Sequence, residues 1–358
     1  MIILSSLLLL ASAQQPAAQP VPAETHNFKD WVVACDNGLR CQALSLVPEP
    51  KADAEVPPAG QEPQDPWERF GLMMFERGPQ ANAPLIVTIS DFEGTPARLL
   101  HYDTPLEGVR ISATEDGAWR LEIADPKTFV DTIYAGSFVV QDAAGKVLTE
   151  LALDGAYGSL LYMDERQGRL RTPTAMVRRG NRPVSVIPAP PPLPVVTVAP
   201  RPREAALTIP KRRLNEARRQ QECGQEEVGG EETHEVEALG NGRSLIMMSC
   251  GSGAYNFNSL PLIAWREGNA IRIEPAKFDF SREGLEAEES ERVLVTNAEF
   301  DAATLTISEY AKGRGIGDCG VSASYAWDGT MFQMTERAEM SECRGARELL
   351  TTWRTERR

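Results

Sequence analysis

Short apolar runs in which every second residue is polar recur along most of this 358-residue chain. Such a period of two is typical of β-strands with one buried face, and the Asp-Gly steps between runs are typical of tight turns. In the first half the runs lie at 85–89, 109–111, 119–123, 138–140 and 147–151. In the second half they lie at 245–250, 262–265, 271–273, 293–295, 305–307, 321–327 and 331–334. The sequence therefore predicts a mainly all-β protein, built of antiparallel β-sandwich or barrel-like domains.

Two segments have a helical rather than an alternating character. Residues 155–166 are expected to form one short helix, and the basic segment 211–219 a second one. An acidic tract follows the second segment, from Glu226 to Glu237. A helix that lies on a membrane surface needs bulkier apolar residues than 211–219 provides, so we expect a solvated helix.

Proline-rich segments indicate how the chain is divided. Residues 187–203 contain seven prolines and predict a linker between a β-sandwich domain at 28–186 and a second β domain at 204–358. A chain of this length favours two domains. Extended polyproline would hold them up to about 50 Å apart, unless residues 195–198 dock as an edge strand. Residues 47–66 are also rich in proline and predict a mobile loop in the first domain.

The N-terminus has the pattern of an export signal. Residues 1–10 are apolar apart from two serines, and Ala11-Ser12-Ala13 is a small-x-small cleavage pattern. We therefore expect a signal peptide at 1–13, a flexible segment at 14–27, and a periplasmic location after cleavage. No later run approaches the roughly 20 apolar residues that a membrane-spanning helix needs, so no transmembrane segment is expected.

Six cysteines allow fifteen pairings, and export favours disulfides over free thiols. Their order along the chain favours three local bonds: Cys35–Cys41, Cys223–Cys250 and Cys319–Cys343. The first would close a hairpin around Asn37-Gly38, a strong turn signal. Metal ligation is disfavoured because the chain has no C-x-x-C pair and no histidine beside a cysteine. No metal site and no cofactor are expected.

The formal net charge of −14 bears on possible partners. An acidic chain repels nucleic acid and anionic membranes on average, so no nucleic-acid partner is expected. Anion binding would need a local cationic patch.

The most distinctive stretch is the Gly-rich loop 312–320, with the sequence KGRGIGDCG. Its backbone N–H groups could line an anion-binding concavity, with Lys312, Arg314 and Asp318 as candidate ligand-binding residues and Arg344 beside the disulfide partner Cys343. An anionic glycan of the envelope is the expected ligand in this interpretation. In the alternative interpretation the glycines serve turns and Arg314 pins the Cys319–Cys343 corner.

Two further interpretations involve residues 251–258. This stretch could present Tyr255 and Phe257 as aromatic anchors, so that loops 251–258 and 312–320 act together in an inhibitor or partner-binding protein. A hydrolase is the third alternative, because Ser252 lies between two glycines and His234 lies upstream. The stretch is not a G-x-S-x-G motif, and no catalytic residue is predicted.

Several of these stretches together resemble a family of exported proteobacterial proteins, domain of unknown function 1176. The resemblance rests on FKDW at 28–31, ACDN at 34–37, CGSGAYN at 250–256, the whole loop 312–320, WDG at 327–329 with Phe332, CRG at 343–345 with Met340, and WR at 353–354. Residues 349–352 depart from the family pattern, which has a Trp-Pro pair there. The first domain also resembles the invasion-associated locus B proteins, which implies an exported immunoglobulin-like sandwich.

The family resemblance implies no activity. The sequence as a whole predicts an exported, disulfide-braced protein of the cell envelope with a few short helices. A non-catalytic binding or structural module is expected, with an envelope glycan or an envelope protein as partner.

Overall fold

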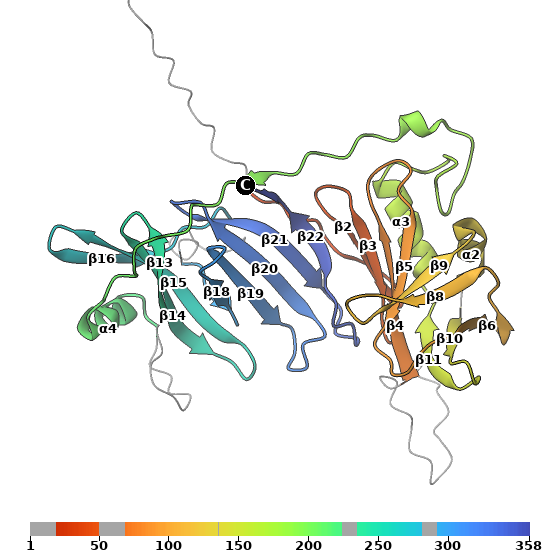
Figure 1. The fold of residues 1–358 in the computed structure, drawn as a ribbon, viewed down its shortest axis with the longest axis horizontal. Helices are drawn as coiled ribbons and strands as arrows, with labels where there is room; N and C mark the ends of the chain where they lie inside the picture. Colours follow the sequence, from red (N-terminus) through yellow and green to blue (C-terminus); the bar gives the residue numbers. More distant parts are fainter. Residues whose placement is uncertain (1–18, 50–68, 135, 224–234, 281–291) are drawn as a thin grey trace, which may run out of the picture.

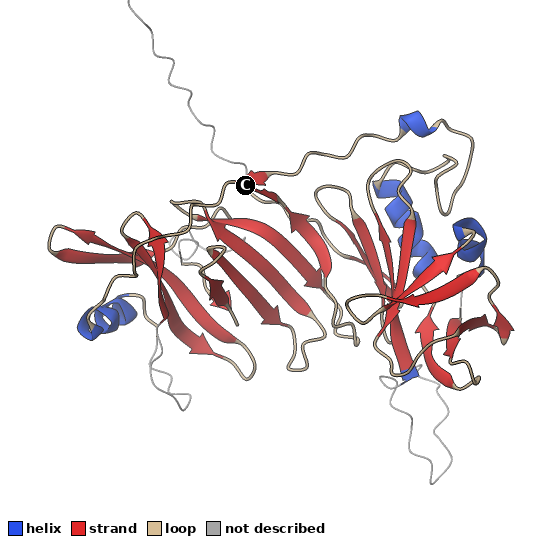
Figure 2. Cartoon of the chain, viewed as in Figure 1, coloured by secondary structure: helices blue, strands red, loops and turns tan. Residues whose placement is uncertain are grey.

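The computed structural model describes residues 19–49, 69–134, 136–223, 235–280 and 292–358 (Figure 1). Strands dominate it, as Figure 2 shows, and most of them pair antiparallel. The prediction of a mainly β protein with a few short helices is therefore confirmed. The expected signal peptide 1–13, residues 14–18 of the flexible segment, and most of the expected loop 47–66 lie outside the described residues.

In the part of the chain that the structure describes, eleven strands precede the proline-rich segment and form what we call the N-terminal half. They are β1 (His26–Phe28), β2 (Trp31–Cys35), β3 (Cys41–Ser45), β4 (Phe70–Arg77), β5 (Leu85–Ser90), β6 (Arg98–His101), β7 (Thr104–Pro105), β8 (Val109–Ala113), β9 (Trp119–Ile123), β10 (Ser137–Gln141) and β11 (Val147–Ala152). The pairing order is β1-β2-β3-β4-β11-β10-β6-β7, and β5 joins β4 to the β8–β9 hairpin. Only the contact between β4 and β11 is parallel among these pairs.

Two of the described helices, α2 (Pro126–Thr132) and α3 (Ala156–Arg166), accompany these strands. α3 buries Leu160 and Met163 in the same core as Trp31 and Phe75 of the sheet. The Trp31 and Phe75 rings stack at 4.5 Å, and the Trp31 indole donates to a backbone carbonyl at 3.0 Å. This helix confirms the prediction for 155–166. The shorter α2 was not predicted.

The C-terminal half contains two further sheets. The first consists of β13 (Glu235–Gly240), β14 (Arg243–Ser252), β15 (Phe257–Glu267), β16 (Ala270–Pro275) and β17 (Val295–Thr296). The second consists of β18 (Glu299–Asp301), β19 (Thr306–Lys312), β20 (Gly320–Trp327), β21 (Phe332–Met340) and β22 (Leu350–Arg354). Side chains from both sheets, among them Leu245, Tyr325 and Trp327, form one core. The basic helix α4 (Lys211–Gln220) buries Leu214 and Ala217 against β14 and β15.

The two halves pack directly on each other. Every residue of β2 and β3 is buried, because these strands are covered on both faces. Val32 and Leu44 face a shared core with Met340 and Leu350 of the C-terminal half. The possible 50 Å separation is therefore wrong: apolar surface on both halves is removed from water by direct contact.

The proline-rich segment runs along the outside of the molecule from one half to the other (Figure 1). Within it β12 (Val195–Val196) pairs in parallel with β23 (Glu356–Arg357), close to the C-terminus. The expected docking of 195–198 as an edge strand is thus confirmed for its first two residues.

All three predicted disulfides are present: Cys35–Cys41, Cys223–Cys250 and Cys319–Cys343. No cysteine is free. The first bond joins directly paired residues of β2 and β3, as expected for a hairpin mouth.

Candidate functional site

The Gly-rich loop joins β19 to β20 and is a closed, tightly bonded turn. The Gly313 N–H donates to the Cys319 carbonyl at 2.8 Å, and the Tyr310 hydroxyl donates to the carbonyls of Gly317 and Cys319. Gly320 has φ +138°, and a Cβ placed there would lie 2.1 Å from the Ala311 carbonyl oxygen. Only glycine fits at position 320, so this glycine is needed for the backbone conformation of the turn.

The charged residues of the loop are bound to each other. The Arg314 Nε lies 2.6 Å from Asp318 Oδ1, and a second guanidinium nitrogen binds the other carboxylate oxygen. The Gly345 N–H also donates to this carboxylate, at 2.8 Å. Burial opposes ionisation of Asp318, but the hydrogen bonds from Arg314 and Gly345 outweigh it and lower its pKa. This geometry supports the interpretation in which Arg314 pins the disulfide corner.

Arg344 spans the boundary between the two halves. Its Nε donates to the Val47 carbonyl and one Nη to the Lys29 carbonyl, both at 3.0 Å. Its other Nη pairs with the Asp30 carboxylate. Arg344 therefore holds the halves together through three contacts, all of them to groups of the N-terminal half.

Loops 251–258 and 312–320 lie side by side and are hydrogen-bonded to each other. Asn256 accepts from the Lys312 N–H at 3.1 Å and donates to the Lys312 carbonyl at 3.0 Å. The Tyr255 hydroxyl donates to the Gly313 carbonyl at 3.2 Å. Asn297 donates to Asn256 and to the Tyr310 carbonyl, both at 2.9 Å. The sequence had not singled out the amides of Asn256 and Asn297, which fix both loops.

These two adjoining loops carry three large apolar residues that are exposed to solvent. Tyr255 is 37% exposed, Phe257 54% and Ile316 61%. The Lys312 amine makes no hydrogen bond or ion pair with the described part of the chain. We call these four residues the two-loop surface. Of the predicted site residues, Tyr255 and Lys312 therefore lie on adjoining loops, whereas Arg314, Asp318 and Arg344 are engaged in internal contacts.

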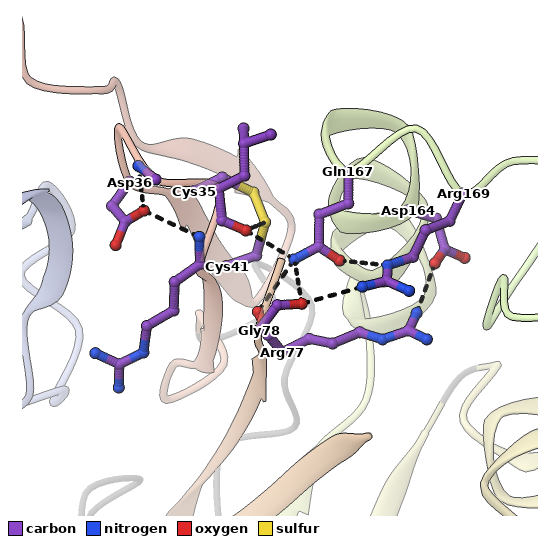
Figure 3. The surroundings of a disulfide bond; sticks show 11 residues. Cys35, Asp36, Cys41, Arg77, Gly78, Asp164, Gln167 and Arg169 are labelled. Carbon is purple, nitrogen blue, oxygen red and sulfur yellow. Dashed lines mark hydrogen bonds and ion pairs between the residues drawn. A yellow bond between two sulfur atoms is a disulfide. The ribbon is translucent and has the colours of Figure 1, made fainter. Parts of the chain in front are cut away.

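A second candidate lies in the N-terminal half, beside the Cys35–Cys41 disulfide (Figure 3). Arg77 and Asp164 form an ion pair at 3.0 Å with side chains only 2% and 1% exposed. Burial lowers the pKa of Arg77 to about 10 and raises the pKa of Asp164. Strongly shifted ionisable groups often mark functional sites.

The groups in this cluster are nevertheless satisfied by the protein itself. The second Asp164 oxygen accepts from the N–H groups of Met176 and Val177. Arg169 donates to Gln167 and to three backbone carbonyls, and Gln167 donates to the Leu39, Arg77 and Gly78 carbonyls. The cluster therefore holds three chain segments together. The hydrogen-bonding groups of Arg77, Asp164, Gln167 and Arg169 described above are used for internal bonds rather than for a ligand.

The described residues show no arrangement of side chains that supports the hydrolase interpretation. His234 lies outside them, so the pairing of Ser252 with a histidine is not described. Within the described ranges no three His, Cys, Asp or Glu side chains are grouped to hold a metal ion. A groove of about 850 Å³ lies between residues 19–25 and β19–β21. Its Glu309 is bound by Tyr325 and Thr296, and its Glu339 by Arg337.

Comparison with known proteins places the chain in a family. A family model described as "Protein of unknown function (DUF1176)" matches residues 25–356, so the chain belongs to that family. The uncharacterized protein YpfG of Escherichia coli (strain K12) is 29% identical over an alignment of 344 positions, and the match covers 88% of this chain and 88% of that protein. No solved structure matches. Among the helices of the described residues, none is long and apolar enough to span a membrane.

Proposed function

We propose that this is an exported protein of the cell envelope that binds a protein partner through the two-loop surface. Export is supported by the three disulfides, which use all six cysteines and persist in oxidising compartments. The observation that carries the binding role is the exposure of Tyr255, Phe257 and Ile316 on two loops that are bonded to each other.

The energetics favour such a role. Complete burial of a fully exposed side chain of this size contributes about 1.5–3 kcal/mol. These three are 37–61% exposed, so each can contribute a part of that value, and together they can anchor an interface. Loops that are already fixed by Asn256 and Asn297 lose little conformational freedom on binding. Lys312 adds one positive charge at the rim, so the expected partner has an apolar patch next to a carboxylate.

Binding of an anionic glycan through Arg314 has less support. An anion would have to compete with Asp318, whose buried carboxylate would then lose its charged partner. Breaking such a pair leaves an uncompensated buried charge, which costs several kcal/mol. Lys312 offers a single positive charge, and Arg314 and Arg344 of the same region are paired with Asp318 and Asp30.

Site-specific photocrosslinking tests the proposal. A benzophenone amino acid replaces Phe257 or Ile316, and Val147, which is 52% exposed in the N-terminal half, serves as the matched control. Envelope extract of the source organism should give an adduct of one discrete mass at 257 and 316 but not at 147. The adduct at 257 should disappear when Tyr255 and Ile316 are replaced by serine. Equal adducts at all three positions, or one that survives the serine replacements, would refute the proposal.

A further inference from the structure

The turn between β6 and β7 has an unusual backbone for its sequence. His101 pairs with Thr104, so Tyr102 and Asp103 form a two-residue hairpin turn. Both have positive φ, 46° and 62°, a geometry that favours Asn-Gly and penalises a bulky residue. A tyrosine held in such a turn is strained, and strain of this kind persists at functional positions.

The Tyr102 side chain is largely exposed yet positioned. It is 73% exposed, and its ring lies 4.2 Å from the His101 ring, centroid to centroid. Its hydroxyl lies over Gly136, where an added Cβ would approach it to 3.1 Å. Gly136, with φ +90°, leaves the space that the tyrosine uses.

A second exposed tyrosine lies close to Gly136 in the chain. Tyr134, two residues before Gly136, is also 73% exposed, and its ring lies 5.2 Å from that of Tyr157 at the start of α3. Tyr102 and Tyr134 are the most exposed aromatic side chains of the described residues. We call His101, Tyr102, Tyr134 and Tyr157 the aromatic cluster.

The chemistry around the cluster restricts the ligand. Asp103 follows Tyr102 in the turn, and Asp154 lies beside Gly136, whose N–H is 3.4 Å from its carboxylate. Lys29 pairs with Asp154 at 3.4 Å. These carboxylates disfavour an anionic ligand but accept hydrogen bonds from hydroxyl groups.

We propose that the aromatic cluster binds a neutral glycan chain. The C–H faces of pyranose rings would stack on Tyr102 and Tyr134, because the negative face of an aromatic ring attracts weakly positive hydrogens. The sugar hydroxyls would donate to Asp103 and to the tyrosine oxygens. This site lies in the N-terminal half and is independent of the proposed protein-binding surface.

Calorimetric titration tests the proposal with two neutral probes, cellohexaose and chitohexaose, and with anionic hyaluronate hexamer. The oxidised protein without residues 1–13 should bind at least one neutral probe more tightly than hyaluronate. Tyr134→Ser should weaken that binding at least about tenfold. Tyr134→Phe keeps the ring and should retain the affinity within a few-fold. Val147→Ser, at a residue that is 52% exposed and outside both proposed sites, serves as the control and should leave the affinity for the neutral probe unchanged.

Tyr102→Gly separates a binding role from a structural one. Glycine suits positive φ, so this variant should melt at a higher temperature while losing the neutral glycan. The proposal is overturned if neither neutral probe binds at millimolar concentration, if hyaluronate binds best, or if the Tyr102 and Tyr134 variants bind like the wild type. A lower melting temperature of Tyr102→Gly would show that the tyrosine is retained for stability instead.

Discussion

Replacing Asp318 by asparagine is expected to lower the free energy of unfolding by about 2–3 kcal/mol. In the folded protein the buried Asp318 carboxylate accepts hydrogen bonds from Arg314 and from the Gly345 N–H. Asparagine fits the same space, but its amide nitrogen donates where the carboxylate oxygen accepts. One of the surrounding donors therefore loses its partner.

The magnitude follows from the exposure of the two partners. A hydrogen bond to a charged group contributes ~1.5–3 kcal/mol, and removing one member of a fully buried pair costs ~3–5 kcal/mol. The Arg314 side chain is 39% exposed, so water solvates it when Asp318 is gone. We therefore expect the effect to lie below the range for a fully buried pair.

Urea unfolding of the oxidised protein measures this effect. A double-mutant cycle with Arg314→Gln isolates the interaction, with an expected coupling of at least ~1 kcal/mol because the two side chains share hydrogen bonds. A loss below ~0.5 kcal/mol for Asp318→Asn, or a coupling energy near zero, would show that the pair does not stabilise the loop.

The same pair makes a prediction about pH. The folded state lowers the pKa of Asp318, so its stabilisation is present above the unfolded carboxyl pKa of ~3.9 and is lost as the pH falls through the folded value. The stability difference between wild type and Asp318→Asn should be constant near neutral pH and should shrink below pH ~4. A difference that grows on acidification would contradict the assigned direction of the pKa shift.

Three other substitutions test the rest of the fold. Asp164→Asn should lower the free energy of unfolding by about 3–5 kcal/mol in urea, because it leaves the buried Arg77 without a counter-charge; an effect under ~1 kcal/mol would contradict this. Leu44→Ala should cost about 2–5 kcal/mol in the same assay, because it opens a cavity in the core shared by the halves; no change would show that the contact is not stabilising. Gly320→Ala should lower the melting temperature in calorimetry, because its Cβ would overlap the Ala311 carbonyl, whereas Gly253→Ala, whose nearest neighbour is 3.9 Å away, should not; equal effects would contradict the steric argument.

Local patterns predicted much of the secondary structure. The alternating runs at 85–89, 119–123 and 147–151 became β5, β9 and β11, and the three disulfides pair cysteines in chain order. Short elements were missed. β7 has two residues and α2 has seven, which is too short for a periodic pattern.

The site was only partly predictable. The sequence favoured loop 312–320 and residues 251–258, and the structure shows that they touch. The sequence did not show that Arg344 pairs with Asp30, because the two residues lie 314 positions apart. The sequence also gave no sign of the aromatic cluster, which combines residues of a turn, of the segment after α2 and of the start of α3.

The sequence by itself determined the fold class, the positions of many of the longer strands and the disulfide pairs, because each depends on residues that are close in the chain. The domain boundaries at 28–186 and 204–358 stay a prediction, since each half has a core of its own and a further buried cluster contains residues of both. Tertiary structure alone decided which charges are used internally and which apolar side chains remain exposed. The physical reason is that burial and ion pairing depend on neighbours in space. The C-terminal half covers β2 and β3, so residues from opposite ends of the chain become neighbours there.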